Sequence, residues 1–139
     1  MLERLNRKKI YVKVWKVKSE ELYDELILEF SEDDVGRFYA LMLKPKNSSK
    51  KAIIGLHGHY DNPYVFKQRY FGEALAKEGF VVIMPYLLMD CTHTENVVAE
   101  MLLKHGFTLM GLRLYKLRVI EEYLKSKGIE KIGIIGHSG

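Results

Sequence analysis

The last four residues, Gly136-His137-Ser138-Gly139, have the types and spacing of a turn that carries a serine nucleophile. They fill the first four positions of the pattern G-x-S-x-G and directly follow the isoleucine-rich run 131–135. In that pattern the serine sits on a sharp turn between a strand and a helix, and small flanking residues let the turn form. The fragment alone is common in loops. Its place after an apolar strand is what predicts that Ser138 is a nucleophile.

A second segment, His57-Gly58-His59, follows another apolar run, 52–56. Acyl transfer needs two N–H donors aimed at the oxyanion of the tetrahedral intermediate. In the strand–turn–helix arrangement one donor follows the nucleophile and the other lies in the loop after a neighbouring strand. The backbone amides of Gly139 and His59 are therefore the candidate oxyanion donors. Read alone, His57-Gly58 could merely turn the chain, and its pairing with the serine turn favours the catalytic interpretation.

The elements that would position these residues differ along the chain. β-Branched and aromatic residues predict strands over 10–17, 22–30 and 37–43, and the turn-forming residues 31–36 predict a hairpin between the last two. After the linker 44–50, short apolar runs predict strands buried on both faces over 52–56, 80–84 and 131–135. Helical periodicity predicts a helix over 64–78 and, after Pro85, a long helical region that is interrupted near Gly106 and whose second part spans 108–127. Glycine caps are expected at Gly79 and Gly128.

This order predicts an α/β fold in which a β-hairpin leads into a mostly parallel sheet with helices on both faces. The chain, 1–139, is expected to be one truncated domain. Its N-terminal strands span 1–44, and a strand-helix-strand-helix-strand unit spans 51–139.

The runs 53–58, 71–83, 106–113 and 132–139 together resemble α/β-hydrolases of the dienelactone hydrolase and acetyl-esterase type. The resemblance implies the N-terminal part of that fold, ending at the nucleophile elbow. It also implies hydrolysis of small carboxylic esters, thioesters or lactones without a cofactor. The implied triad order is serine, acid, histidine, so the acid and histidine lie beyond residue 139 and the chain as given is expected to be inactive. Pro85 is followed here by Tyr86 rather than by the aspartate of many relatives.

Other interpretations stay open at this point. A serine peptidase could be built on the same fold, and a non-catalytic truncated chain would act only through binding. An upstream base, His93 or His105, is disfavoured by the chain order that the resemblance implies. Cys91, with Asp90 and His93 in one loop, does not form a triad pattern, and the histidines lack the spacing of a four-ligand zinc site, so no metal is predicted.

Composition limits the kinds of molecule that the chain is expected to bind. The net charge is +4, but the lysines are interleaved with glutamates instead of forming a basic stripe, so nucleic acid is not a predicted partner. No apolar run reaches the roughly 18 residues that cross a bilayer. The single cysteine, Cys91, fits a reducing compartment and predicts a cytoplasmic protein. The expected partners are a small-molecule ester and, through the exposed edge of strand 131–135, a second copy of the chain.

Overall fold

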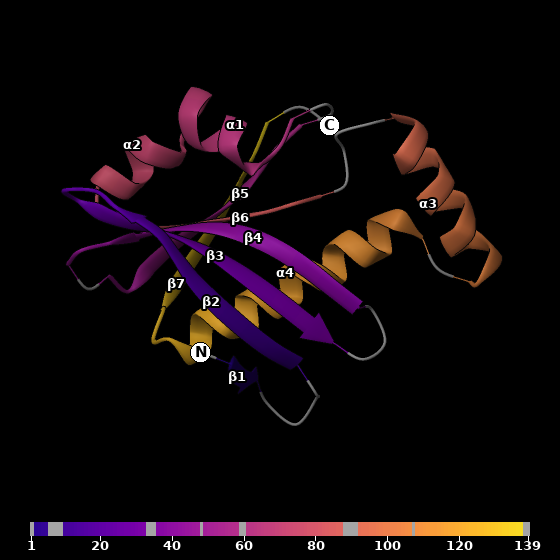
Figure 1. The fold of residues 1–139 in the computed structure, drawn as a ribbon, viewed down its shortest axis with the longest axis horizontal. Coiled ribbons are helices and arrows are strands. Elements are labelled where there is room, and N and C mark those ends of the chain that lie inside the picture. The colour runs from indigo at the N-terminus through magenta and orange to yellow at the C-terminus, as the bar shows by residue number, and fades with distance from the viewer. Residues whose placement is uncertain are drawn as a thin grey trace.

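The computed structural model describes residues 2–5, 10–32, 36–47, 49–58, 61–87, 92–106 and 108–137 (Figure 1). The strands in these ranges are β1 (Leu2–Leu5), β2 (Ile10–Ser19), β3 (Tyr23–Glu32), β4 (Gly36–Pro45), β5 (Lys51–Leu56), β6 (Val81–Pro85) and β7 (Lys131–Gly136). The helices are α1 (Pro63–Arg69), α2 (Gly72–Lys77), α3 (Thr92–Lys104) and α4 (Leu109–Ser126). None of these helices is long and apolar enough to cross a membrane.

The strands form one mixed sheet in the order β1-β2-β3-β4-β6-β5-β7. The predicted hairpin is confirmed, because β3 and β4 pair antiparallel from Tyr23↔Pro45 to Glu32↔Gly36. The prediction of a mostly parallel sheet is wrong for the sheet as a whole, since only the β5–β6 and β5–β7 pairings are parallel. Parallel neighbours need a crossover connection. Only a few residues separate each of the first four strands from the next, too few for a crossover, so parallel pairing is confined to the three strands of the helix-containing part.

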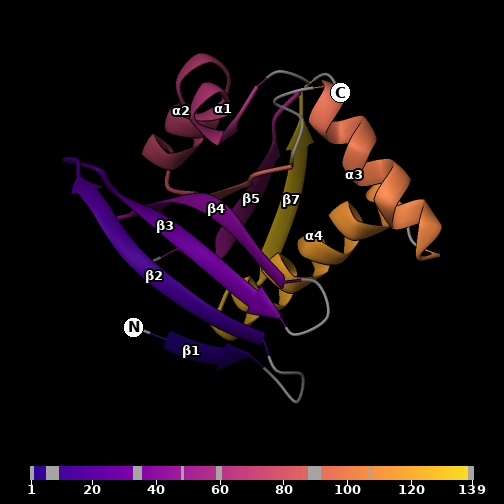
Figure 2. The same ribbon diagram turned by 45° about the vertical axis from the view of Figure 1, so that its right-hand side comes forward.

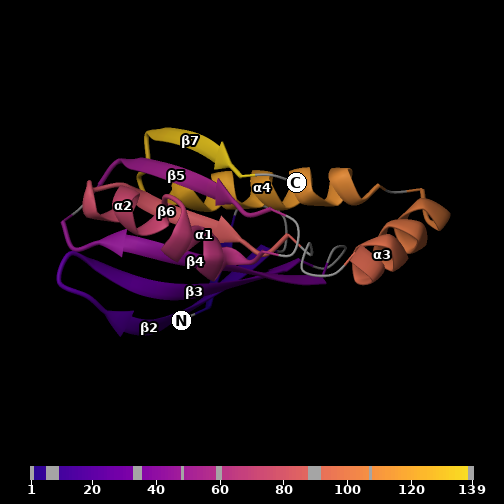
Figure 3. The same cartoon turned by 90° about the horizontal axis from the view of Figure 1, so that it is seen from above.

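Helices cover both faces of the sheet, as predicted. Figures 2 and 3 show α1 and α2 on one side of β5 and β7 and α4 on the other. Because successive side chains of a strand point to opposite faces, β4 contributes to both layers. Ala40 and Met42 belong to the cluster under α4, whereas Leu41 and Leu43 belong to the cluster under α1 and α2.

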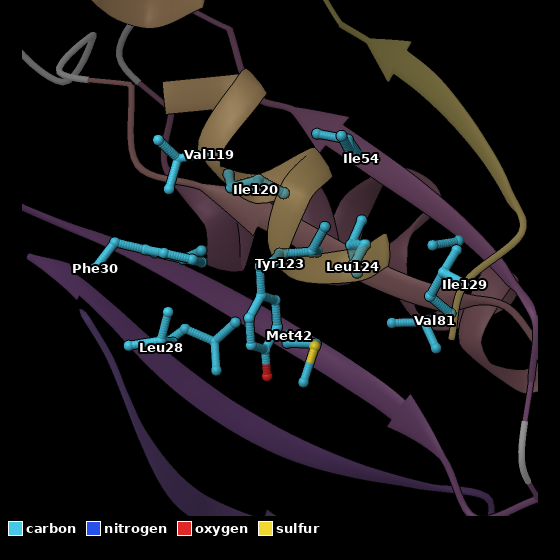
Figure 4. Close-up of a cluster of buried hydrophobic side chains, with 14 of the residues drawn as sticks. Leu28, Phe30, Met42, Ile54, Val81, Val119, Ile120, Tyr123, Leu124 and Ile129 are labelled. Carbon is cyan, nitrogen blue, oxygen red and sulfur yellow. The ribbon is translucent and has the colours of Figure 1, made fainter. Parts of the chain in front are cut away.

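The larger core lies between α4 and the sheet (Figure 4). The buried side chains of α4 that meet it are Val119, Ile120, Tyr123 and Leu124. The Tyr123 ring meets Phe30 edge-on at a centroid distance of 5.7 Å, and Phe30 stacks on Phe38 at 4.8 Å. Burying one such side chain stabilises the fold by about 1.5–3 kcal/mol, so packing rather than helix propensity fixes the position of α4.

The single helix predicted over 64–78 is wrong, because the structure breaks it into α1 and α2. Tyr70 lies at the break with non-helical backbone angles, φ −110° and ψ −104°. The two short helices approach each other so closely that a Cβ added to Gly72 would lie 2.6 Å from the Cα of Lys67. Periodicity alone does not reveal such a contact. The predicted cap is confirmed, since Gly79 has φ +97°.

A buried ion pair ties α1 to β3. The ammonium group of Lys67 contacts the carboxylate of Glu25, and these residues are 3% and 2% exposed. The Lys67 Nζ also lies 3.9 Å from Glu73 Oε1, which accepts a hydrogen bond of 3.1 Å from the Tyr23 hydroxyl. A buried charge is tolerated only when it is paired, so this cluster fixes the α1–α2 unit on the sheet.

Tyr23 makes the stability of this cluster sensitive to alkaline pH. Burial, together with the hydrogen bond to Glu73, raises the pKa of Tyr23 to about 12 from an ordinary value of 10.0. The phenol must lose its proton more easily in the unfolded chain, so its stabilisation is complete below pH 10 and is lost as the pH rises toward 12. We expect Tyr23→Phe to weaken the fall in the free energy of unfolding over this range. Absorbance titration at 295 nm checks the pKa, and identical pH profiles for the two proteins would refute the prediction.

Strand β7 lies at an edge of the described sheet, in agreement with the exposed edge expected for 131–135, but its side chains are exposed or half-buried rather than buried on both faces as predicted. Its Ile134 side chain is 58% exposed, and the edge of β7 away from β5 has no partner strand in the described sheet, which favours pairing with another strand. We expect the 139-residue chain to self-associate with rising concentration and Ile134→Lys to reduce the association. Val17→Lys, an exposed site on β2, is the matched control. A monodisperse monomer at high concentration in light scattering would contradict this prediction.

Candidate functional site

The carboxyl ends of β5 and β7 lie side by side. Parallel pairing sets Leu56 opposite Gly136, and the His137 N–H donates a hydrogen bond of 3.0 Å to the Leu56 carbonyl. The segments that begin at His57 and at Gly136 therefore leave the sheet next to each other. Ligands of open α/β sheets bind at this edge.

The structure describes four of the predicted site residues: His57, Gly58, Gly136 and His137. Ser138, Gly139 and His59 lie outside the described residues, so their roles stay predictions. Gly136 has room around it, because an added Cβ would meet its nearest neighbour, the Leu56 Cβ, at 3.9 Å.

His57 is buried and joins two loops. Its Nδ1 lies 3.0 Å from the Gly58 carbonyl oxygen, and its Nε2 accepts a hydrogen bond of 3.0 Å from the Leu87 N–H. An acceptor at Nε2 and a carbonyl at Nδ1 require the neutral imidazole with its proton on Nδ1. The side chain thus holds the segment after β5 to the segment after β6.

Arg113 of α4 binds the other backbone group of the same residue, Leu87. Its Nε donates a hydrogen bond of 3.0 Å to the Leu87 carbonyl, and the residue is only 8% exposed. Together, His57 and Arg113 fix both the N–H and the carbonyl of Leu87. The sequence interpretation missed this contact. The sequence offers one indication of this contact, because Arg113 and Lys116 are charged residues that lie on the same face of the helix as Ile120 and Tyr123.

Lys116 occupies a similar buried position one turn later. Its ammonium lies 5.5 Å from the centroid of the Phe38 ring. Burial, with a smaller contribution from the charge of Arg113, lowers the pKa of Lys116. The carboxyl edge of the sheet on the α4 side is therefore lined by two neighbouring cationic side chains.

Close packing of α1 on β5 sets the position of the His57 segment. The Phe66 ring is fully buried, and a Cβ added to Gly55 would lie 2.4 Å from it.

We expect Gly55→Ala to destabilise the fold by about 1–3 kcal/mol through overpacking. Gly136→Ala is the control, since its added Cβ has space. Chemical denaturation compares the two, and equal free energies of unfolding would show that Phe66 does not restrict Gly55.

The His137 side chain lies on Tyr70 from the break between α1 and α2. The two rings are stacked with centroids 3.7 Å apart and planes 25° apart. Sequence reasoning missed Tyr70, because it assigned this position to the middle of a continuous helix.

The other candidate bases are placed less favourably or not described. His105 lies past the end of α3, is exposed, and has its Nδ1 2.9 Å from the Met101 carbonyl oxygen. His93 belongs to the first turn of α3, and Asp90 and Cys91 lie outside the described residues. Within the described ranges, no group of three or more histidine, cysteine or acidic side chains could hold a metal ion.

A recess of about 310 Å³ borders the candidate site on the α1 face. Its lining is apolar and aromatic and consists of Ile27, Tyr39, Ala40, Leu41, Asn62, Pro63, Tyr64 and Tyr86. Tyr86 connects the recess with the site, because its ring centroid is 5.9 Å from that of His57 and its N–H donates to the Tyr39 carbonyl at 3.0 Å. A second recess of about 430 Å³ lies near Val81 and Ile129, at the amino ends of the parallel strands. The first recess therefore lies at the carboxyl ends of the parallel strands, where ligands of open α/β sheets bind.

Comparison with known proteins shows a shared fold. A crystal structure from Bacteroides fragilis NCTC 9343, of a protein provisionally named an acetyl xylan esterase, matches with a TM-score of 0.73 and 20% identity. The match covers 91% of this chain and 42% of that one, so the chain spans less than half the length of that protein. Acetyl xylan esterase 1 from Thermoanaerobacterium sp. JW/SL YS485 matches over 54% of this chain and 23% of its own, with a TM-score of 0.40 and 20% identity.

No protein-family model and no curated protein sequence matches the chain. At 20% identity, the match to the Bacteroides structure shows a similar fold and nothing more. The chain therefore shares the fold of the corresponding part of that Bacteroides protein.

Proposed function

We propose that this chain is the N-terminal part of a serine hydrolase that acts on small carboxylic esters, or on thioesters or lactones. The observation that carries the proposal is the hydrogen bond from His137 N–H to the Leu56 carbonyl. It sets the segment that leads into Ser138 beside the segment that leads into His59. Those are the two places from which a nucleophile and an oxyanion donor must come.

In the proposed reaction the Ser138 Oγ attacks the ester carbonyl and its proton passes to a histidine downstream of residue 139. The backbone N–H groups of His59 and Gly139 stabilise the oxyanion. The histidine then protonates the leaving alcohol, and water hydrolyses the acyl-serine to regenerate the enzyme. An acid downstream orients that histidine. The protein groups supply all of these steps, so the proposal includes no cofactor.

Two further features support a small ester as substrate. The recess beside His57 has about 310 Å³, at the lower end of the range for small-molecule sites, and its lining is apolar. The esterase-like fold is compatible with this chemistry, although fold alone does not assign function. We also propose that the protein is related to the dienelactone hydrolase and acetyl-esterase group that its sequence resembles. A cytoplasmic location is also proposed, on the single cysteine.

The test is a substrate comparison on a polypeptide that continues past Gly139 through the acid and histidine. Small p-nitrophenyl esters and matched p-nitroanilides of short peptides are assayed with the unmodified protein and with Ser138→Ala. Ester hydrolysis that depends on Ser138 and exceeds anilide hydrolysis supports the proposal. Preferred cleavage of peptide anilides would replace it with the serine peptidase alternative. No Ser138-dependent turnover of either class would favour a non-catalytic chain.

A further inference from the structure

We infer that Tyr70 is a positioning residue for the turn that carries Ser138 and that it acts through the imidazole of His137. The inference rests on the proposed function, because that function requires the serine. The Tyr70 and His137 rings are stacked at a centroid distance of 3.7 Å. His137 directly precedes Ser138, and a planar peptide bond passes a change of orientation at one residue to the next.

The described contacts leave the His137 ring dependent on this stack. Its backbone N–H is bound to the Leu56 carbonyl, which fixes the chain but not the ring. Its Nδ1 is shielded from solvent and has no hydrogen-bond partner among the described residues. The stacked ring at 3.7 Å is therefore the described contact that orients the imidazole. Tyr70 is the residue that supplies this contact.

Tyr70 is itself held by the interior of the α1 face. Its ring centroid is 6.4 Å from that of the fully buried Phe66, whose own ring packs against Gly55 of β5. A series of contacts therefore runs from β5 through Phe66 and Tyr70 to the end of β7. The break between α1 and α2 places Tyr70 in this series, which gives the interruption of the helix a role at the candidate site.

A catalytic serine must be placed accurately, because a displacement of about 1 Å can lower a rate by about 10²-fold. We expect Tyr70→Leu to lower kcat for p-nitrophenyl acetate by about 10- to 100-fold while KM changes little. Tyr70→Phe keeps the stacked ring and should retain most of kcat. His137→Leu removes the stack from the other side and should reproduce the loss. If Tyr70→Leu does not fold, the kcat of His137→Leu tests the inference in its place.

The experiment measures kcat, KM and thermal midpoint for these variants in the polypeptide that continues past Gly139. Phe71→Leu, an exposed neighbouring aromatic, is the matched control and should leave kcat unchanged. Proton NMR of the His137 ring should show an upfield ring-current shift that Tyr70→Leu removes and Tyr70→Phe preserves. Unchanged kcat in Tyr70→Leu, or an equal loss in Tyr70→Phe, with Ser138 still essential, would overturn the inference alone. Full activity in Ser138→Ala would instead overturn the proposed function, and the inference with it.

Discussion

The 139-residue chain is expected to hydrolyse p-nitrophenyl acetate no faster than its Ser138→Ala variant. A polypeptide extended through the acid and histidine should show turnover that depends on Ser138. A serine hydroxyl is a weak nucleophile without a base to take its proton. Losing triad function in a serine hydrolase can lower kcat by about 10⁶-fold, which sets the expected difference between the two chain lengths.

The short chain should also lose oxyanion stabilisation. In it, Gly139 carries the terminal carboxylate, whose negative charge repels a developing oxyanion nearby. The helix whose positive N-terminal end would follow Ser138 is missing from the short chain as well. Turnover by the short chain that disappears in Ser138→Ala would contradict this expectation. It would show that an upstream residue acts as base, and His93 and His105 would be examined first.

The second large effect concerns stability. Lys67→Met removes the partner of the buried Glu25 carboxylate, and breaking a buried ion pair from one side costs about 3–5 kcal/mol. We therefore expect the free energy of unfolding in urea to fall by that amount. Met keeps the length and the apolar stem of the side chain, so the change isolates the charge.

Two controls separate the charge from the packing. The double variant Lys67→Met with Glu25→Leu should recover most of the loss, because both buried charges are then gone. Lys125→Met breaks an exposed pair with Glu121 one helical turn away and should cost only a few tenths of a kcal/mol. A loss in Lys67→Met no greater than in Lys125→Met would show that the buried pair does not hold α1 on the sheet.

Local patterns predicted much of the fold. The β3–β4 hairpin, the positions of the short apolar strands and the glycine caps are governed by neighbouring residues, and the structure confirms them. Strand order and direction were predicted only in part, because they depend on pairings between distant segments. Nothing near β4 in the sequence indicates that it pairs antiparallel with β6, whereas the edge position of β7 agrees with the exposed edge expected for 131–135.

At the candidate site, the sequence predicted where backbone segments meet but not what holds them there. Motif spacing located His57 and His137, and the structure places their segments side by side. Motif spacing did not predict that the His57 ring accepts a hydrogen bond from the Leu87 N–H, or that Tyr70 stacks on His137. Both contacts join residues about 30 or more positions apart. Each depends on side-chain directions that only the packed helices determine.

The most direct test of the central claim is to locate the reactive nucleophile. The extended polypeptide is treated with diethyl p-nitrophenyl phosphate, in which serine Oγ displaces p-nitrophenolate and forms a phosphate ester, and the modified residue is found by peptide mass spectrometry. We predict one diethylphosphoryl group per chain on Ser138, no modification in Ser138→Ala, and loss of esterase activity in proportion to labelling. Modification of a different residue, together with esterase activity that survives in Ser138→Ala, would contradict the assignment of Ser138 as the nucleophile.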